Sequence, residues 1–328
     1  MKITMAHGSG GKSTSELISS VFAPRFGNPA LNRMGDSSVV PGAGRIAVTT
    51  DSFVVTPVFF PGGDIGRLSV CGTVNDLLMS GSRPQYLTCG FILQEGVETE
   101  DLETIVDSMA ETAREAGVTI IAGDTKVVEG SGGMFINTSG VGFLPEGRDI
   151  GPENCREGDA VLLSGNLGDH HAAILSARMG IQNTIRSDCA PLGEMVSSML
   201  QAGVRVRAMR DVTRGGLGTV LNEFAEASDC CIELREADIP VSQQVRSFCG
   251  ILGLDPLYMG NEGKMAAVVA AEDAERALAC IRNSRYGASA ARIGTVVPGD
   301  GGSVLLKTEV GGTRVVTSLY GEGLPRIC

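Results

Sequence analysis

The pattern of apolar and polar residues along the chain alternates between two periods. Apolar residues that recur every three or four positions predict helices, and short runs of β-branched and aromatic residues between them predict strands. The clearest helix covers 99–116, because Thr99 is a suitable N-cap, acids fill the first turn and Gly117 follows. The first half thus predicts helices at 13–22, 65–79 and 99–116, and strands at 46–50, 53–59, 86–93, 118–122 and 134–143.

The second half repeats this alternation after a turn-rich linker at 144–158. It predicts strands at 160–164, 265–270, 291–297, 303–307 and 314–319, and helices at 170–179, 191–202, 216–227, 241–252 and 274–283. Strands that alternate with helices in two halves of domain size predict an α/β (α+β) fold with two domains, at 36–150 and 151–320. Glycine-rich composition predicts a flexible N-terminal arm at 1–35 and a mobile tail at 321–328.

Composition narrows the possible functions of these 328 residues. The formal charge is −11 and Trp is absent, which argues against a nucleic-acid partner. The longest apolar stretch, 266–271, is far below the roughly 20 residues that span a membrane, and the first residues lack the apolar core of a signal peptide. We therefore expect a cytoplasmic protein with reduced thiols. Its nine cysteines form no Cys-x-x-Cys pair, and the ninth, Cys328, is the last residue.

A glycine-rich segment near the N-terminus resembles a phosphate-binding P-loop. Gly-Ser-Gly-Gly-Lys-Ser occupies 8–13, but the P-loop pattern requires glycine where Ala6 stands, and too few residues precede it for a buried strand. A flexible arm is therefore the favoured interpretation. Backbone N–H groups at Gly10 and Gly11, together with Lys12, would still suit an anion.

Five aspartates stand beside glycine or small polar residues at the predicted ends of elements, with Asp76 as an exception inside an apolar helix. They are Asp36, Asp51, Asp76, Asp124 and Asp211. Carboxylates without histidine suit Mg²⁺, which usually arrives with nucleotide phosphates. For any single aspartate, a turn or helix cap is the favoured alternative. Glu262, flanked by Gly260, Asn261 and Gly263 before a strand, is either a general base or a solvated turn residue.

Seven short motifs occur in one order along nearly the whole chain. They are Gly-Ser-Gly-Gly-Lys, Gly-Asp-Ser-Ser-Val-Val, Thr-Thr-Asp-Ser, Val-Asn-Asp-Leu, Gly-Asp-Thr-Lys-Val-Val, Arg-Asp-Val-Thr-Arg-Gly-Gly-Leu and Gly-Asn-Glu-Gly-Lys. This series resembles the ATP-using superfamily of aminoimidazole ribonucleotide synthetase, selenophosphate synthetase and thiamine-monophosphate kinase. The ending Pro-Arg-Ile-Cys resembles the members that mature nickel–iron hydrogenases.

The resemblance implies a PurM-like fold, with a mixed sheet and packed helices in each domain, and a homodimer whose N-terminal sheets pair. It also implies ATP at Gly10, Gly11, Lys12, Asp51, Asn75, Asp76, Asp124 and Thr125, and Mg²⁺ at the five aspartates. A carbamoyl group from the carbamoyltransferase HypF would be carried on Cys328 and dehydrated to a thiocyanate. The cyanide would then pass to iron held by a HypC–HypD complex.

The same resemblance gives Glu262 and Lys126 the roles of base and proton relay, with Cys328 as carrier. A surface lysine in a loop is the alternative for Lys126, and a chance cysteine at a frayed end is the alternative for Cys328. Two other functions stay open. One is a small-molecule kinase or synthetase such as selenophosphate synthetase, against which the absence of cysteine in 1–35 counts. The other is a non-catalytic scaffold that docks maturation proteins through its tail.

Overall fold

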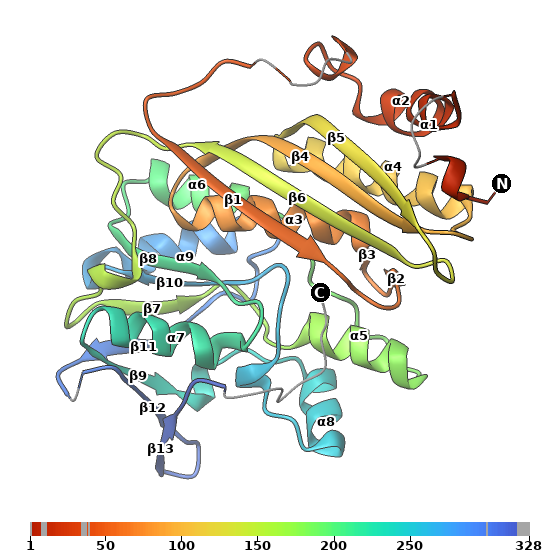
Figure 1. The fold of residues 1–328 in the computed structure, drawn as a ribbon. Helices are drawn as coiled ribbons and strands as arrows, with labels where there is room; N and C mark the ends of the chain where they lie inside the picture. The colour runs from red at the N-terminus through yellow and green to blue at the C-terminus, as the bar shows by residue number, and fades with distance from the viewer. Residues whose placement is uncertain (1, 8–11, 34–37, 39, 300, 320–328) are drawn as a thin grey trace.

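The computed structural model describes residues 2–7, 12–33, 38, 40–299 and 301–319. The described chain forms a four-stranded sheet, a seven-stranded sheet and the small ribbon of β2 (Phe59–Phe60) and β3 (Gly63–Asp64). Figure 1 shows the two large sheets one above the other, each with its own helices. No helix in the described part of the chain is long and apolar enough to cross a membrane.

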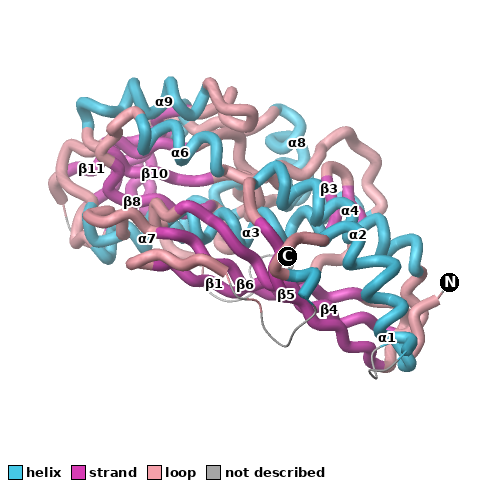
Figure 2. Tube along the Cα trace, turned by 90° about the horizontal axis from the view of Figure 1, so that it is seen from above, coloured by secondary structure: helices cyan, strands magenta, loops and turns pink. Residues whose placement is uncertain are grey.

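The four-stranded sheet has the strand order β1-β6-β4-β5. Its pairs are antiparallel except β4 with β5, so the sheet is mixed. Helices α3 and α4 cover one face, as Figures 1 and 2 show, while Ile46, Val48 and Ile92 on the opposite face are exposed. The elements are β1 (Ile46–Phe53), α3 (Ile65–Met79), β4 (Arg83–Gln94), α4 (Thr99–Ala116), β5 (Thr119–Val128) and β6 (Met134–Phe143).

Helix α3 lies at the centre of the molecule. Every residue of α3 is buried except the half-buried Arg67 and Asp76, because the helix packs on the first sheet, on α4 and on β8 of the second sheet. Asp64 caps its first turn by accepting a hydrogen bond from the Arg67 N–H at 2.9 Å. The predicted bounds of α3 and α4 are confirmed. The N-cap of α4, however, is Glu98 rather than the predicted Thr99, which is the first residue of the helix.

The seven-stranded sheet has the order β13-β12-β9-β11-β7-β10-β8 and is antiparallel except where β12 pairs with β9. Its neighbouring inner strands β7 and β10 are buried along their whole length, so both faces of the sheet are covered there. The elements are β7 (Ala160–Leu163), α5 (Asp169–Met179), α6 (Gly193–Gln201), β8 (Val206–Asp211), α7 (Gly216–Ala227), β9 (Cys231–Arg235), α8 (Gln243–Leu252), β10 (Met265–Val269), α9 (Ala274–Arg282), β11 (Ala291–Val297), β12 (Ser303–Lys307) and β13 (Thr313–Val316).

The segment predicted as a flexible N-terminal arm is packed over much of its length. Residues 12–26 form α1 (Lys12–Leu17), a π-helical turn (Ile18–Phe22) and α2 (Ala23–Phe26). Leu17, Val21 and Phe22 are buried in the core, and the ring of Phe22 lies 5.1 Å from that of Phe91 on β4. The expectation of a flexible arm is therefore wrong for this part, because its apolar residues reach the edge of the first sheet.

The strand predictions also need correction at several places. Residues 54–58 are not a strand, β5 continues six residues beyond the predicted end, and β8 and β9 were not predicted. Consequently Asp51 and Asp124 lie within strands rather than after them, and Asp211 is the last residue of β8. The strands were hard to find because β5 and β8 carry charged residues on an exposed side, which interrupts the apolar run.

Candidate active site

Four carboxyl groups line one cleft of about 840 Å³ between the two halves of the chain. Asp51 comes from β1, Asp76 from α3, Asp211 from the last position of β8, and Glu262 from the turn before β10. These elements meet because α3 packs against both β1 and β8. The structure thus brings together three of the five predicted aspartates and the predicted base.

The position of Asp51 follows from strand alternation. Phe53 is buried in the core and Thr49 reaches α3, where its hydroxyl donates to Asp76 Oδ2 at 2.9 Å. Because side chains two apart share a face, Asp51 also faces α3. Gly72 of α3 lies opposite, and a side chain there would come within 3 Å of the Phe53 ring and 3.6 Å of Asp51 Oδ2. Glycine at 72 therefore keeps the cleft open.

The carboxyl groups in the cleft disfavour one another's ionisation. Burial is the main cause that raises the pKa values of Asp51 and Asp76, and the charge of Asp51 raises that of Asp76 further. Burial, followed by the charge of Asp76, raises the pKa of Asp211 to about 7. Burial, followed by the charge of Asp211, raises the pKa of Glu262 well above its usual range. A bound cation would favour the ionised forms and reverse these shifts.

Two arginines that sequence reasoning missed line the same cleft. Arg210 forms an ion pair with Glu223 at 2.8 Å. Arg214 makes no hydrogen bond or ion pair that involves another described residue, and its charge lowers the pKa values of Asp51 and Asp76. Both flank Asp211 in the motif Arg-Asp-Val-Thr-Arg, so the signal was present in the sequence. A free guanidinium beside carboxylates suits phosphate oxygens.

Asp124 and Lys126 lie on the other face of the first sheet. Lys126 pairs in register with the exposed Ile92 of β4, whereas the next residue along β5, Val127, is buried. The Lys126 ammonium lies 2.8 Å from Asp124 Oδ2, and both side chains are more than 60% exposed. Strands β1 and β5 are separated by β6 and β4, which puts Asp124 about 14 Å from Asp51 along the sheet. Within one chain, Asp124 and Lys126 therefore do not join the cleft.

The other predicted nucleotide contacts lie apart from the cleft. Thr125 lines a hollow of about 290 Å³ between β5 and the N-terminal helices. Asn75 is buried at the junction of the two halves, where its amide donates to the Ala190 carbonyl at 3.0 Å and accepts from the Leu192 N–H at 2.9 Å. Gly10, Gly11, Asp36 and Cys328 lie outside the described residues, as does the side chain of Lys12.

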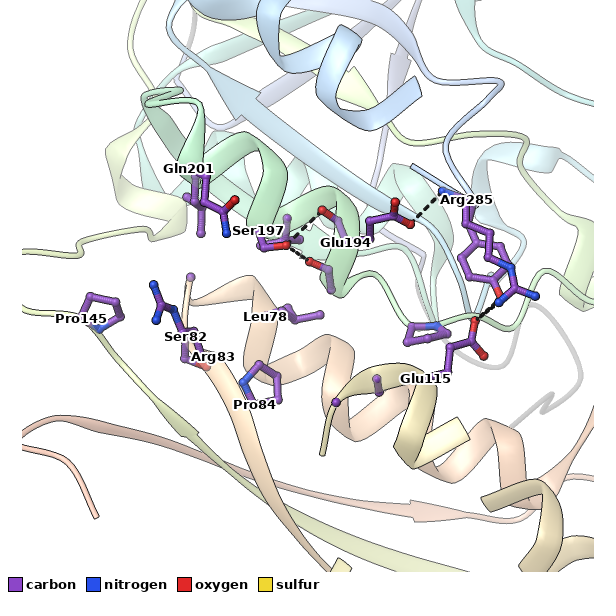
Figure 3. Close-up of a pocket in the computed structure, with 18 of the residues that line it drawn as sticks. Leu78, Ser82, Arg83, Pro84, Glu115, Pro145, Glu194, Ser197, Gln201 and Arg285 are labelled. Carbon is purple, nitrogen blue, oxygen red and sulfur yellow. Dashed lines mark hydrogen bonds and ion pairs between the residues drawn. The ribbon is translucent and has the colours of Figure 1, made fainter. Parts of the chain in front are cut away.

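A further cleft, of about 700 Å³, contains none of the predicted site residues. Figure 3 shows it between α6, which contributes Glu194, Ser197 and Gln201, and the end of α3 with the start of β4. One end is closed by the ion pair of Arg285 with Glu115 at 3.0 Å. The charged groups at that end satisfy each other, and the predicted carboxyl groups lie in the four-carboxyl cleft instead.

The donors in the four-carboxyl cleft fit Mg²⁺ that is held jointly with phosphates. Among the described residues, no group of three or more His, Cys, Asp or Glu side chains is placed to hold a metal ion alone. Mg²⁺, however, commonly takes only one or two protein carboxylates and completes its shell with water and phosphate oxygens. The mutual repulsion of Asp51, Asp76 and Asp211 is the kind that such a cation relieves.

The comparison with known proteins agrees with this architecture. Residues 34–144 match the model of the AIR synthase related protein, N-terminal domain, and residues 156–307 match the model of its C-terminal domain. The chain therefore belongs to the AIR synthase related family. Within that family it belongs with the HypE proteins, because relatives of that name are 45–50% identical over 99–100% of this chain.

The similarity to HypE covers the whole chain. Carbamoyl dehydratase HypE of Cupriavidus necator is 50% identical over 333 residues, which cover 100% of this chain and 95% of that protein. The crystal structure of the hydrogenase maturation protein HypE in complex with ATP is 45% identical, with a TM-score of 0.95 and 99% of each chain covered. The structure of a HypE–HypF complex is 46% identical, with a TM-score of 0.81, and covers 92% of this chain and 99% of that one.

Proposed function

We propose that this protein is an ATP-dependent carbamoyl dehydratase that makes the cyanide ligand of nickel–iron hydrogenases. Its substrate is a carbamoyl group carried as a thiocarboxamide on Cys328, and its product is a thiocyanate on the same sulfur. The observation that carries the proposal is the cleft in which Asp51, Asp76 and Asp211 surround a space beside the buried Glu262. The match to carbamoyl dehydratases over the full chain supports it.

The reaction needs an activated oxygen and the loss of two protons. The carbamoyl oxygen attacks the γ-phosphorus of ATP while one N–H proton leaves, which releases ADP. The second N–H proton leaves as the C–O bond breaks and phosphate departs, so that a C≡N bond remains on sulfur. Phosphorylation is required because an amide oxygen is a poor leaving group. The chain must therefore hold a polyphosphate beside a base.

The residues of the cleft divide these tasks. Asp51, Asp76 and Asp211, with Asp36 and Asp124, would hold Mg²⁺, which supplies charge neutralisation at the phosphates when bound. Arg214 and Lys12 would contact phosphate oxygens directly. Glu262 would accept a proton from nitrogen, since a carboxylate with a raised pKa is a stronger base once it is ionised. Lys126 would relay a proton, and Asn75 and Thr125 would complete the nucleotide site with Gly10 and Gly11.

A homodimer would bring Asp124 and Lys126 to the cleft. They lie on the exposed face of the first sheet, together with the exposed apolar residues Ile46, Val48 and Ile92. If two copies pair through this face, each copy gains a cover for its apolar side chains. We further propose that HypF delivers the carbamoyl group, that a HypC–HypD complex accepts the cyanide, and that the reaction takes place in the cytoplasm. The crystallised HypE–HypF complex supports the first of these partners.

Intact-mass analysis tests the proposal. The chain is incubated with HypF and a carbamoyl donor, and then with ATP and Mg²⁺. We expect a gain of one carbamoyl group, followed by the loss of one water on the C-terminal peptide. Removal of Cys328 alone should abolish the gain and leave ATP binding intact. Loading of the truncated chain would refute the carrier role, and a loaded chain that releases no phosphate from ATP would favour the non-catalytic scaffold.

A further inference from the structure

Glu262 is held in place through its backbone by the segment 187–190. Its N–H donates to Asp188 Oδ1 at 3.0 Å, and its carbonyl oxygen accepts from the Ala190 N–H at 3.4 Å and from the Asn75 amide at 3.4 Å. The side chain of Asp188 is only 4% exposed. The position of the proposed base thus depends on a buried acid that lies far from it in the sequence.

The second oxygen of Asp188 faces Lys264. The Lys264 ammonium lies 3.3 Å from Asp188 Oδ2 and donates to the Gly263 carbonyl at 3.1 Å, and the lysine side chain is only 9% exposed. Asp188 Oδ2 makes no hydrogen bond in the described part of the chain, so the nearby ammonium supplies its stabilisation. Asp188 therefore links the backbone of Glu262 to a lysine two residues further along.

Close packing prevents the turn of Glu262 from shifting against the segment 187–190. A side chain at Gly263 would lie 1.9 Å from the Asp188 carbonyl oxygen and 2.9 Å from the Ala190 nitrogen. On the other side, the Asn261 amide donates to the Val212 carbonyl at 3.1 Å and accepts from the Gly168 N–H at 2.7 Å. Because Val212 follows Asp211 directly, these bonds hold the turn of Glu262 at a set distance from the acids of the cleft.

A buried ion pair is by itself weak evidence for a stabilising role. Desolvation of two charges commonly offsets their attraction, so a well-packed apolar pair would stabilise the fold as well. Removal of one partner is different, because it leaves the other charge buried without compensation. The other acid near the pair is Asp169, whose pKa burial and the charge of Asp188 raise to about 6. Asp188 bonds directly to the backbone N–H of Glu262, which favours a role in placing Glu262.

We propose that Asp188 and Lys264 are positioning residues that hold Glu262 at the reacting nitrogen during dehydration of the carbamoyl group. Neither residue lines the four-carboxyl cleft, and both act through the backbone of Glu262. The inference rests on the proposed function, because it assigns Glu262 the role of base. Loss of the pair lets the segment 187–190 and the turn of Glu262 shift relative to Asp211, which slows the chemical step without weakening ATP binding.

Single-turnover experiments on the carbamoylated full-length chain test the pair. The rate of water loss is followed by intact mass at several ATP concentrations in Asp188→Asn and Lys264→Met. We expect the maximal rate to fall roughly 100-fold, as a displacement of about 1 Å can cause. The ATP concentration at half-maximal rate should stay close to that of the unaltered protein. The matched control is Asp273→Asn, which breaks a buried carboxylate's ion pair with Arg205 far from the cleft and should lower the melting temperature without changing the rate.

The outcomes separate the inference from the proposed function. If the unaltered carbamoylated chain loses no water with ATP, the proposed function fails. If it does, and the folded variants react at the unaltered rate or lose only ATP affinity, the inference is overturned. Should neither variant fold, Asp188→Glu decides, because it keeps the charge pair but adds one methylene that pushes on Glu262. A reduced maximal rate in Asp188→Glu supports the pair, and an unchanged rate overturns it.

Discussion

Replacement of Asp211 by asparagine should stabilise the protein at neutral and alkaline pH. Asp211 is 8% exposed, and burial together with the charges of Asp76 and Asp51 raises its pKa from 3.8 to about 7. Ionisation of this group in the folded state is therefore costly, whereas in the unfolded chain it is not. The substitution Asp211→Asn keeps the shape of the side chain and removes the charge.

The size of the effect follows from the pKa. At about 1.4 kcal/mol for each pH unit between 3.8 and about 7, ionised Asp211 costs about 4 kcal/mol of folding free energy. Because the pKa of Asp211 is higher in the folded state than in the unfolded chain, the stability contributed by its protonated form is fully present below about pH 4. It is lost as the pH rises to about 7, and changes no further above that. Asp211→Asn should thus match the original at pH 4 and exceed it by about 4 kcal/mol at pH 8.

Urea unfolding followed by far-ultraviolet circular dichroism is the suitable assay, since the chain has no tryptophan. Measurements at pH 4, 6 and 8 with a chelator and without ATP keep cations away from the cleft. Asp273→Asn is the control with the opposite sign, because hydrogen bonds from Arg205 lower the pKa of Asp273 and its loss should destabilise at neutral pH. If the free energies of unfolding of Asp211→Asn and the original protein run parallel from pH 4 to 8, the reasoning about the crowded carboxyl groups is refuted.

Three further substitutions test other parts of the structure. Asn75→Ala should lower the free energy of unfolding in urea by about 3 kcal/mol, because the buried Ala190 carbonyl and Leu192 N–H lose their hydrogen bonds. A loss below about 1 kcal/mol would contradict the role of Asn75 in joining the two halves. Phe22→Ala should cost about 3 kcal/mol, since its buried ring packs on Phe91, and an unchanged melting temperature would mean that the arm is loose. Lys126→Ala should leave stability unchanged, because its pair with Asp124 is exposed, yet slow water loss in the intact-mass assay; an unaltered rate would remove Lys126 from the proposed mechanism.

The sequence predicts elements best where local signals agree. The bounds of α3, α4, α7, β6, β11 and β12 match the predicted ranges. In α4, for example, apolar periodicity, acids in the first turn and Gly117 after the last residue coincide. Strand β8 was missed because Arg207 and Arg210 interrupt its apolar run, although four of its six residues are buried. The adjacent His170 and His171, in the first turn of α5, are both buried, and His170 Nδ1 lies 2.7 Å from the Ser187 hydroxyl.

By itself the sequence determined the family and supplied the candidate site residues, since the motifs and the terminal Cys328 can be read directly from the chain. Only the tertiary structure decided which of those residues meet. Asp51, Asp76, Asp211 and Glu262 converge because α3 packs on β1 and β8, whereas strand alternation turns Asp124 and Lys126 to the opposite face. The physical reason is that the local sequence decides which side chains share one face of a helix or strand. Long-range packing decides which other helices and strands that face contacts.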